Sequence, residues 1–155
     1  MVKHPEELGF KLGLKVHIGQ PARIMWADRA ASTTRDVVYV ALLDDSRRLN
    51  KGDALKVGQA GSLKRRWQGI VAIFEPHRKL RDNEKSDRSK LLEFANGKEI
   101  SVWMKEAGKT EIPYAKGLTK TNAFSTRCAE EEFLDQYYEP KFGKPLNRER
   151  TTETD

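Results

Sequence analysis

Apolar residues occur along this chain in short runs whose spacing first predicts a small sheet. Residues 37–43 (VVYVALL) form a continuous apolar run rich in β-branched side chains, which is typical of a buried strand. Residues 44–53 are polar and turn-like, and residues 54–59 (ALKVGQ) predict a second short strand, so the two strands form a hairpin with a long loop. Residues 100–104 (ISVWM) predict a third strand.

Between the second and third strands the apolar spacing becomes helical. Gly61 breaks the second strand, and Ser62 offers an N-cap for a helix over residues 63–74, which Pro76 ends. The apolar residues of this helix fall on one face: Leu63, Trp67, Ile70, Val71 and Phe74.

Two more helices are predicted nearer the end of the chain. Residues 91–94 belong to a second helix, which Asn96-Gly97 stops. Residues 127–138 predict a third helix, and residues 107–123, which show no clear period, are expected to form a loop. The apolar stripe of the third helix is Phe133, Leu134 and Tyr137.

This order of elements predicts an α+β domain with a small three-stranded, mostly antiparallel sheet flanked by helices. We assign the domain to residues 37–147, with residues 148–155 as a flexible tail. Residues 1–36 form an N-terminal extension of unclear role. Within it, residues 8–18 alternate in polarity and residues 22–27 form another apolar run, so the extension could add a strand or a helix to the core.

The composition excludes several classes of protein. Of the 155 residues 37% are hydrophobic, enough for a modest core, but no run of about 18 apolar residues could span a membrane. The single cysteine, Cys128, can form neither an intrachain disulfide nor a cysteine cluster for zinc. The first residues, MVKHPEELGF, lack the apolar stretch of a signal peptide. We therefore expect a cytoplasmic protein with no membrane partner.

The charge is basic but unevenly distributed. The formal net charge is +6 and the pI about 9.4, which weakly favours a polyanionic partner. Residues 63–105 carry +5, whereas residues 106–155 carry −2. A polyanion site and an acidic metal site could thus occupy different parts of one surface, although two solvated helices of opposite charge would explain the same counts.

Short motifs on the predicted strands carry the candidate chemistry. The first strand contains residues 37–39 (VVY) and the second contains residues 56–58 (KVG), with Arg66 ten residues after Lys56. A run of glutamates later leads to two prolines and an asparagine: Glu130, Glu131, Glu132, Pro140, Pro145 and Asn147. This ordered set resembles the GIY-YIG nuclease family, whose strands end in Gly-Ile-Tyr and Tyr-Ile-Gly and whose next helix carries an arginine.

The chain departs from the family pattern in three places. Val37 and Val38 replace the Gly and Ile of the first motif, which a strand tolerates. Lys56 replaces the second Tyr, a residue that the family uses in catalysis. The spacing from the glutamates to Asn147 is also slightly long, as if a residue or two were inserted in residues 141–144.

The resemblance implies a divalent-metal-dependent DNA endonuclease that hydrolyses phosphodiester bonds, of restriction, phage or mobile-element type. Tyr39 would be the general base and Arg66 a bidentate phosphate clamp. A glutamate on the late helix would hold Mg²⁺, with Mn²⁺ as an alternative ion, because Mg²⁺ uses few protein ligands. Asn147 would orient the site.

Three positions admit two interpretations each. Glu130 has apolar residues three and four positions later, as in the family, whereas Glu131 has the better distance to Asn147, so either could bind the metal. Lys56 either supplies a cation near the scissile phosphate or near Tyr39, or marks an inactive copy. His77 either makes an acid–base or phosphate contact, as family members do in this region, or is a surface histidine in a basic loop.

Basic side chains in the middle of the chain would contact DNA phosphates, which positions DNA without reading its sequence. They are Lys64, Arg65, Arg78, Lys79, Arg81, Lys85, Arg88 and Lys90. The alternative functions are a catalytically degenerate DNA-binding module that keeps the nuclease fold and, more weakly, a basic protein–protein adaptor. Cutting both strands with one active site would suggest a dimer, although no interface is legible in the sequence.

Overall fold

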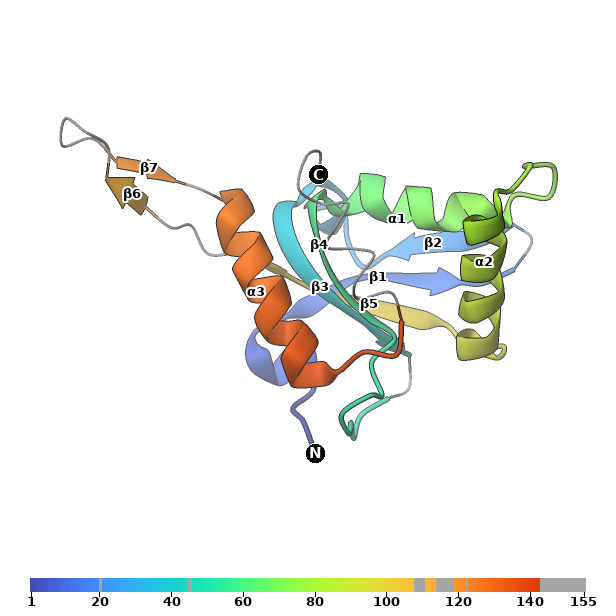
Figure 1. The fold of residues 1–155 in the computed structure, drawn as a ribbon, viewed down its shortest axis with the longest axis horizontal. Helices are drawn as coiled ribbons and strands as arrows, with labels where there is room; N and C mark the ends of the chain where they lie inside the picture. The colour runs from blue at the N-terminus through green and yellow to red at the C-terminus, as the bar shows by residue number, and fades with distance from the viewer. Residues whose placement is uncertain (20, 45, 108–110, 114–118, 122, 143–155) are drawn as a thin grey trace.

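The computed structural model describes residues 1–19, 21–44, 46–107, 111–113, 119–121 and 123–142. Its centre is a five-stranded sheet in the order β2-β1-β5-β3-β4, in which every neighbouring pair is antiparallel (Figure 1). The strands are β1 (Lys11–His17), β2 (Arg23–Trp26), β3 (Arg35–Leu43), β4 (Lys56–Ser62) and β5 (Ile100–Glu106). The α+β class is therefore confirmed, whereas the predicted number of three strands is wrong.

The two additional strands come from the N-terminal segment. β1 pairs with β5 on one side and with β2 on the other. Leu14 and Val16 are fully buried because alternate residues of β1 face the same core. Lys15, between them, forms a salt bridge with Asp44, with 3.0 Å between Nζ and Oδ1. Residues 11–26 therefore extend the sheet, a role that the sequence alone left open.

The predicted hairpin is present as β3 and β4. The register pairs Arg35 with Ser62 and Val37 with Ala60, so Gly61 does not break the second strand as predicted. The small residues near the end of β4 still pair with β3, because the hydrogen bonds between the strands are made by the backbone and need no side chain. β4 lies at the edge of the sheet, which leaves one side of this strand without a neighbouring strand.

Three helical segments cover one face of the sheet (Figure 1): α1 (Leu63–Val71), the 3₁₀ helix η3 (Ala72–Phe74) and α2 (Asp82–Ala95). The Ser62 hydroxyl accepts a hydrogen bond from the Arg65 backbone N–H at 3.2 Å, which confirms the predicted N-cap. Asn96 adopts a left-handed conformation with φ of 45°, which confirms the predicted stop of α2. The core on this face, called cluster 1, includes Leu14, Tyr39, Leu63, Trp67, Phe74 and Leu91.

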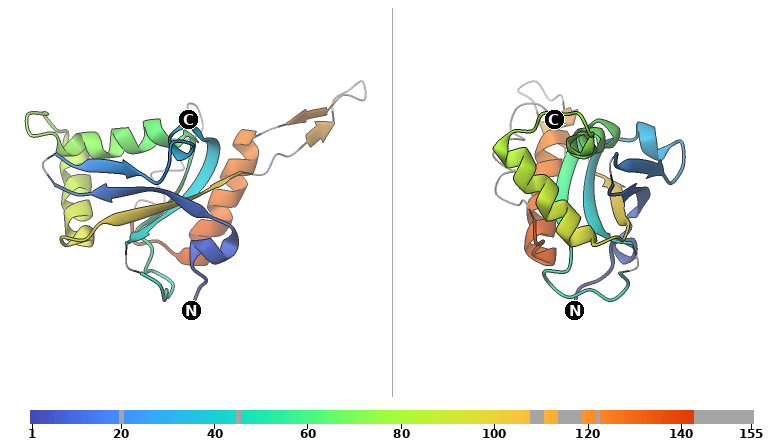
Figure 2. Two further views of the ribbon diagram at one scale, coloured as in Figure 1. Left: turned by 180° about the vertical axis from the view of Figure 1, so that it is seen from behind. Right: turned by 90° about the vertical axis from the view of Figure 1, so that its right-hand side faces the viewer.

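The opposite face is covered by α3 (Ala123–Tyr138), which packs on β3 and β4 (Figure 2). Leu134 and Tyr138 are buried there in cluster 2, together with Val38, Val40, Leu42 and Trp103. Phe133, by contrast, is 63% exposed, whereas Tyr137 is half-buried against cluster 2, so the predicted apolar stripe of this helix is wrong for Phe133 alone. The buried side of α3 is thus rotated away from Phe133, and charged side chains occupy several of its positions.

Other described elements lie outside these layers. Within the expected loop, β6 (Glu111–Pro113) and β7 (Thr119–Thr121) form a short ladder that projects away from the main sheet (Figure 1). Two 3₁₀ turns, η1 (Pro5–Leu8) and η2 (Ala31–Thr33), precede β1 and β3. In the described part of the chain, helices are too short or too polar to cross a membrane.

Candidate functional site

Tyr39 lies in the middle of β3, directly opposite Gly58 of β4. Its side chain is fully buried, and its ring lies over the backbone of that glycine. A Cβ atom built at Gly58 would overlap the phenol of Tyr39. The glycine of the second motif is therefore required by the close approach of the tyrosine of the first motif.

Trp67 of α1 fixes the other side of the phenol. The rings of Tyr39 and Trp67 meet edge to face, with centroids 5.6 Å apart and planes at 67°. Trp67 is 1% exposed, so the contact ties α1 to the middle of β3. The tyrosine is thus held between the glycine of one strand and the indole of a helix.

Lys56 lies on the same face of the hairpin as Tyr39. It is the first residue of β4 and pairs with Ala41, two positions after Tyr39 on β3. Residues in this diagonal relation usually have Cα atoms roughly 7–8 Å apart. Lys56 is only 9% exposed, so most of its side chain is packed within the protein. The register therefore places the phenol and a cation on one face of the hairpin.

Arg66 reaches this face from α1. It directly precedes Trp67, and it shares a helix flank with Leu63 and Ile70, which pack in or against cluster 1. Because the Ser62 cap fixes the start of α1, the position of this flank relative to β4 is also fixed. Tyr39, Lys56 and the flank of α1 that carries Arg66 therefore lie on one face of the hairpin.

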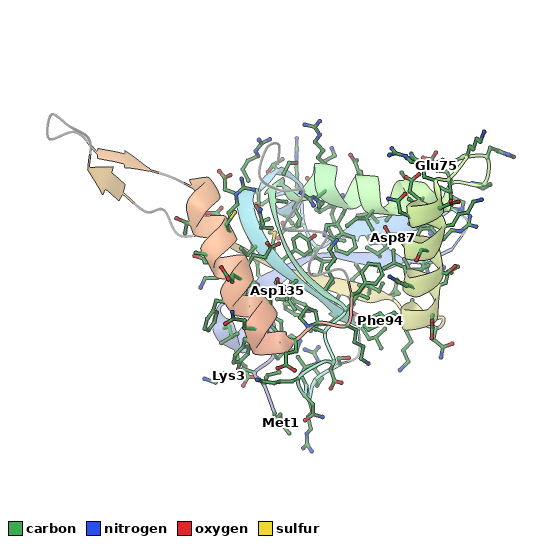
Figure 3. All side chains as sticks on the ribbon, in the orientation of Figure 1. Met1, Lys3, Glu75, Asp87, Phe94 and Asp135 are labelled. Atoms are coloured by element: carbon green, nitrogen blue, oxygen red, sulfur yellow. The ribbon has the colours of Figure 1, made fainter. Side chains whose placement is uncertain are left out.

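The candidate metal ligands lie on α3 and so come from the opposite face of the same strands. Glu131 is 2% exposed, and Asp135, one turn later, is 1% exposed. Figure 3 shows Asp135 on the side of α3 that faces the strands. Glu130 is half-buried on the flank of the helix. Since β4 is an edge strand, it is the one strand around which the two groups of candidate residues could meet.

Contacts to β3 and β4 fix α3 in this place. Gln59 Nε2 lies 3.8 Å from Cys128 Sγ, in hydrogen-bond contact with the thiol. Arg127 is 4% exposed and its Nε lies 3.6 Å from Asp36 Oδ1 at the start of β3. Asp36 has a positive φ of 55°, which an aspartate tolerates better than most residues.

The burial of a row of charges on α3 was not predicted from the sequence, which singled out Glu131 as a candidate metal ligand but neither Arg127 nor Asp135. Arg127, Glu131 and Asp135 recur every four residues, which places them on one helix face. This four-residue spacing was the signal available in the sequence, because it places the three charges on the same side of the helix as the apolar Leu134 and Tyr138. Charged residues at helical spacing usually face solvent, whereas here Arg127, Glu131 and Asp135 are buried, with Asp36 close to Arg127.

The donor set on α3 fits Mg²⁺ only as a sparse site. Within the described ranges, no three side chains of His, Cys, Asp or Glu form a group that could hold a metal ion. Mg²⁺ keeps several of its waters and needs only one or two carboxylates. Glu130 or Glu131 could supply one, and the half-exposed side chain of Glu130 leaves more room for those waters.

Two other predicted site residues lie apart from this centre. His77 is exposed and follows η3, beyond the far end of α1 from the Ser62 cap, so the structure does not bring it to Tyr39. Asn147 lies outside the described residues. After α3 the chain returns to the hairpin, where the Lys141 backbone N–H donates a hydrogen bond to the Ala54 carbonyl at 2.9 Å, just before β4 begins.

The predicted phosphate-contacting residues are divided between α1, α2 and the loop that joins η3 to α2. Lys64, Arg65 and Arg66 give α1 three bases and no acid, whereas α2 carries four acids and three bases. The predicted residues outside α1 are Arg78, Lys79, Arg81, Lys85, Arg88 and Lys90; all are exposed except Arg88, which is half-buried. The basic excess therefore lies on α1 and the loop more than on α2.

Glu84 offsets part of the charge of that loop. Its carboxylate lies 3.2 Å from Arg78 Nη2 and 3.7 Å from Arg81 Nε. The hydrogen bond from the Arg81 backbone N–H, helped by the Arg78 side chain, lowers the pKa of Glu84. Lys90 of α2 instead lies over the ring of Phe142, 5.5 Å from its centroid.

Comparison with known proteins identifies similar folds. No protein-family model and no curated protein sequence matches this chain. A Glu-to-Ala mutant of bacteriophage T4 EndoII superposes with a TM-score of 0.60 and 15% identity, covering 89% of this chain and 94% of that chain. Restriction endonuclease HPY188I in complex with product DNA gives a TM-score of 0.48 and 14% identity, covering 88% and 84%. This chain thus has a nuclease-like α+β fold similar to that of EndoII.

Proposed function

We propose that this chain is a divalent-metal-dependent DNA endonuclease of the GIY-YIG type, acting in restriction, in a phage or in a mobile element. The observation that carries the proposal is the phenol of Tyr39 lying over Gly58, with Lys56 on the same face of the hairpin. The fold that the chain shares with EndoII supports the same conclusion.

In this proposal Tyr39 accepts the proton of the attacking water. A tyrosine does this only as a phenolate, and a cation on the same face favours that form. Lys56 therefore replaces the tyrosine of the second motif by supplying positive charge at the phenol and at the phosphate. This interpretation of Lys56 also explains why the lysine is held at 9% exposure on β4.

Arg66 would bind two oxygens of the scissile phosphate with its guanidinium fork. Glu130 or Glu131 would hold the metal ion, with Asn147 orienting the site. A bound Mg²⁺ or Mn²⁺ would offset the charge that develops on the phosphoryl oxygens.

A plasmid-nicking assay with Mg²⁺ and with Mn²⁺ tests the proposal. The wild-type chain should nick supercoiled DNA, and the double variant Glu130→Ala, Glu131→Ala should not, while EDTA should stop the reaction. Glu132→Ala is the matched control, because Glu132 is an exposed glutamate of the same helix and should be dispensable. The two single variants then identify the metal ligand. DNA binding without cleavage by the wild-type chain in either metal would instead establish a non-cleaving DNA-binding module.

A further inference from the structure

We infer that Arg29 and Arg35, together with Lys64 and Arg65, form a second phosphate-binding surface for duplex DNA at the beginning of α1. This inference rests on the proposed function, since it takes DNA as the partner. It goes beyond that function because it gives the N-terminal segment, and in particular residues 28–36, a role in binding. We call this set of four residues the α1-start surface.

The register of the hairpin places Arg35 at the beginning of α1. Arg35 of β3 pairs directly with Ser62, the residue that caps α1. Lys64 and Arg65 follow within the first turn of the helix, where each residue advances only about 1.5 Å. Arg35 is thereby brought next to two basic residues that lie far from it in the sequence, at one end of the β3–β4 hairpin.

A rigid turn places Arg29 near the same helix. The Asp28 carboxylate accepts a hydrogen bond from the Ala31 backbone N–H at 2.8 Å, and the Ser32 hydroxyl donates one to the Arg29 carbonyl at 2.8 Å. Ala31 is fully buried, and η2, which contains it, packs against α1. The backbone that carries Arg29 is therefore fixed, which lowers the entropic cost of using its side chain in binding.

The side chains of the α1-start surface face solvent, and their charge exceeds that of the acids around them. Arg29, Arg35, Lys64 and Arg65 are all exposed. Asp28 caps the turn just described, and Asp36 lies 3.6 Å from Arg127. Glu106 of β5 pairs directly with Val37 and is exposed, so it is the one further acid next to this end of β3 among the described residues of the sheet.

The distance from this surface to the proposed site suits a bound duplex. Arg35 precedes Tyr39 by four positions on β3, or about 13 Å. Base pairs of B-form DNA rise about 3.4 Å each, so this span equals about four base pairs. A duplex whose scissile phosphate lies at Tyr39 would therefore bring other phosphates to Arg35 and to the first turn of α1.

The test measures the salt dependence of DNA binding by the double variant Arg29→Ala, Arg35→Ala. Fluorescence anisotropy with a labelled duplex of about three helical turns, in EDTA to prevent cleavage, would be recorded between about 50 and 200 mM salt. Losing two phosphate contacts should make the slope of log K against log salt shallower by roughly 2 and weaken binding at least about tenfold near 0.1 M. The charge-conserving variant Arg29→Lys, Arg35→Lys should keep the wild-type slope.

The matched control is Arg47→Ala, Arg48→Ala, which removes the same charge from the loop between β3 and β4. Both arginines are exposed, and this loop lies at the opposite end of the hairpin from the start of α1 (Figure 1). The control should keep most of the wild-type slope. An equal loss in both alanine variants, or no loss in Arg29→Ala, Arg35→Ala while the wild type binds, would overturn the inference. Salt-insensitive binding by the wild type would instead contradict the proposed function itself.

Discussion

The two faces of the β3–β4 hairpin carry different chemistry on the same pair of strands. On the face covered by α1, Tyr39 and Lys56 lie beside a helix that carries three bases. On the face covered by α3, Arg127, Glu131 and Asp135 are buried between the helix and the sheet. The first face gains its geometry from a glycine that leaves room for a ring, and the second from charges packed among apolar residues. Apart from substitutions of the candidate metal ligands Glu130 and Glu131, those on the first face should therefore mainly affect cleavage and those on the second mainly stability.

The sharpest test of this comparison is a pair of tyrosine-to-phenylalanine variants, one on each face. Tyr39→Phe keeps the ring over Gly58 and removes only the hydroxyl, so the protein should fold while cleavage falls at least about 100-fold, as expected for loss of a general base. Plasmid nicking under single-turnover conditions measures this loss.

Tyr138→Phe is the matched control on the α3 face. The Tyr138 hydroxyl donates a hydrogen bond to the Lys3 carbonyl at 2.8 Å, and burial raises the pKa of this phenol, so it stays protonated and cannot serve as a base. Its variant should lose about 1 kcal/mol of unfolding free energy and keep the wild-type cleavage rate. Equal cleavage by both variants would remove the functional difference between the faces.

Neighbouring apolar residues of α3 test which side of this helix is buried. Leu134→Ala should cost about 2–5 kcal/mol of unfolding free energy, because Leu134 is 4% exposed within cluster 2. Phe133→Ala should cost less than about 0.5 kcal/mol, since Phe133 is 63% exposed. Urea denaturation of the two variants measures both values, and a larger loss from Phe133→Ala would contradict the orientation of α3 in which Leu134 is buried and Phe133 exposed.

A third test addresses the glycine beneath the phenol. Gly58→Ala introduces a Cβ where the Tyr39 ring lies, so the ring must move, at a cost of roughly 1–3 kcal/mol. Cleavage should fall with it, because the phenol would leave its place. Gly69→Ala is the control, since a Cβ there meets no atom within 4 Å, and in a helix alanine should be neutral or stabilising. Normal cleavage by Gly58→Ala would show that the close approach is unimportant.

Much of the fold could be predicted from the sequence because its signals are local. The apolar run over residues 37–43, the serine cap at Ser62 and the stop at Asn96 each depend on a few neighbouring residues, and each has its expected effect. Pairing between distant segments has no such signal. The alternation over residues 8–18 fits a strand, but nothing in it specifies that β1 would pair with β5.

The candidate site was predictable to the same extent. The spacing of Tyr39, Lys56 and Arg66 follows from one hairpin and the helix after it, so its residues lie on one face. The orientation of α3 was not predictable, since it depends on the burial of charges such as that of Arg127, which lies near Asp36 of the distant strand β3. The exposure of Phe133 also removes part of the argument for Glu130, and the choice between the two glutamates stays a prediction.

The smallest expected effect is a pH dependence of stability on the α3 side of the sheet, where His4 lies. Its ring meets Trp103 edge to face at 4.7 Å, and its Nδ1 accepts a hydrogen bond from the Glu6 backbone N–H at 3.0 Å. Burial, aided by the positive charge of Arg47, lowers the pKa of His4 below its ordinary value of 6.5, although Glu6 and Glu7 act in the opposite direction.

The sign of the effect follows from which state binds more protons. Because the folded protein disfavours protonated His4, the unfolded chain takes up a proton first as the pH falls. The contribution of His4 to stability is thus complete above about pH 6.5 and is lost as the pH falls toward and through the lowered pKa of the folded state. His4→Asn keeps an acceptor for the Glu6 N–H but cannot titrate, so urea unfolding at pH 7.5 and pH 5 should show a smaller acid-induced loss in the variant than in the wild type. Equal losses would mean that protonation of His4 does not destabilise this side of the sheet, and that the acid sensitivity of the α3 face comes from its carboxylates alone.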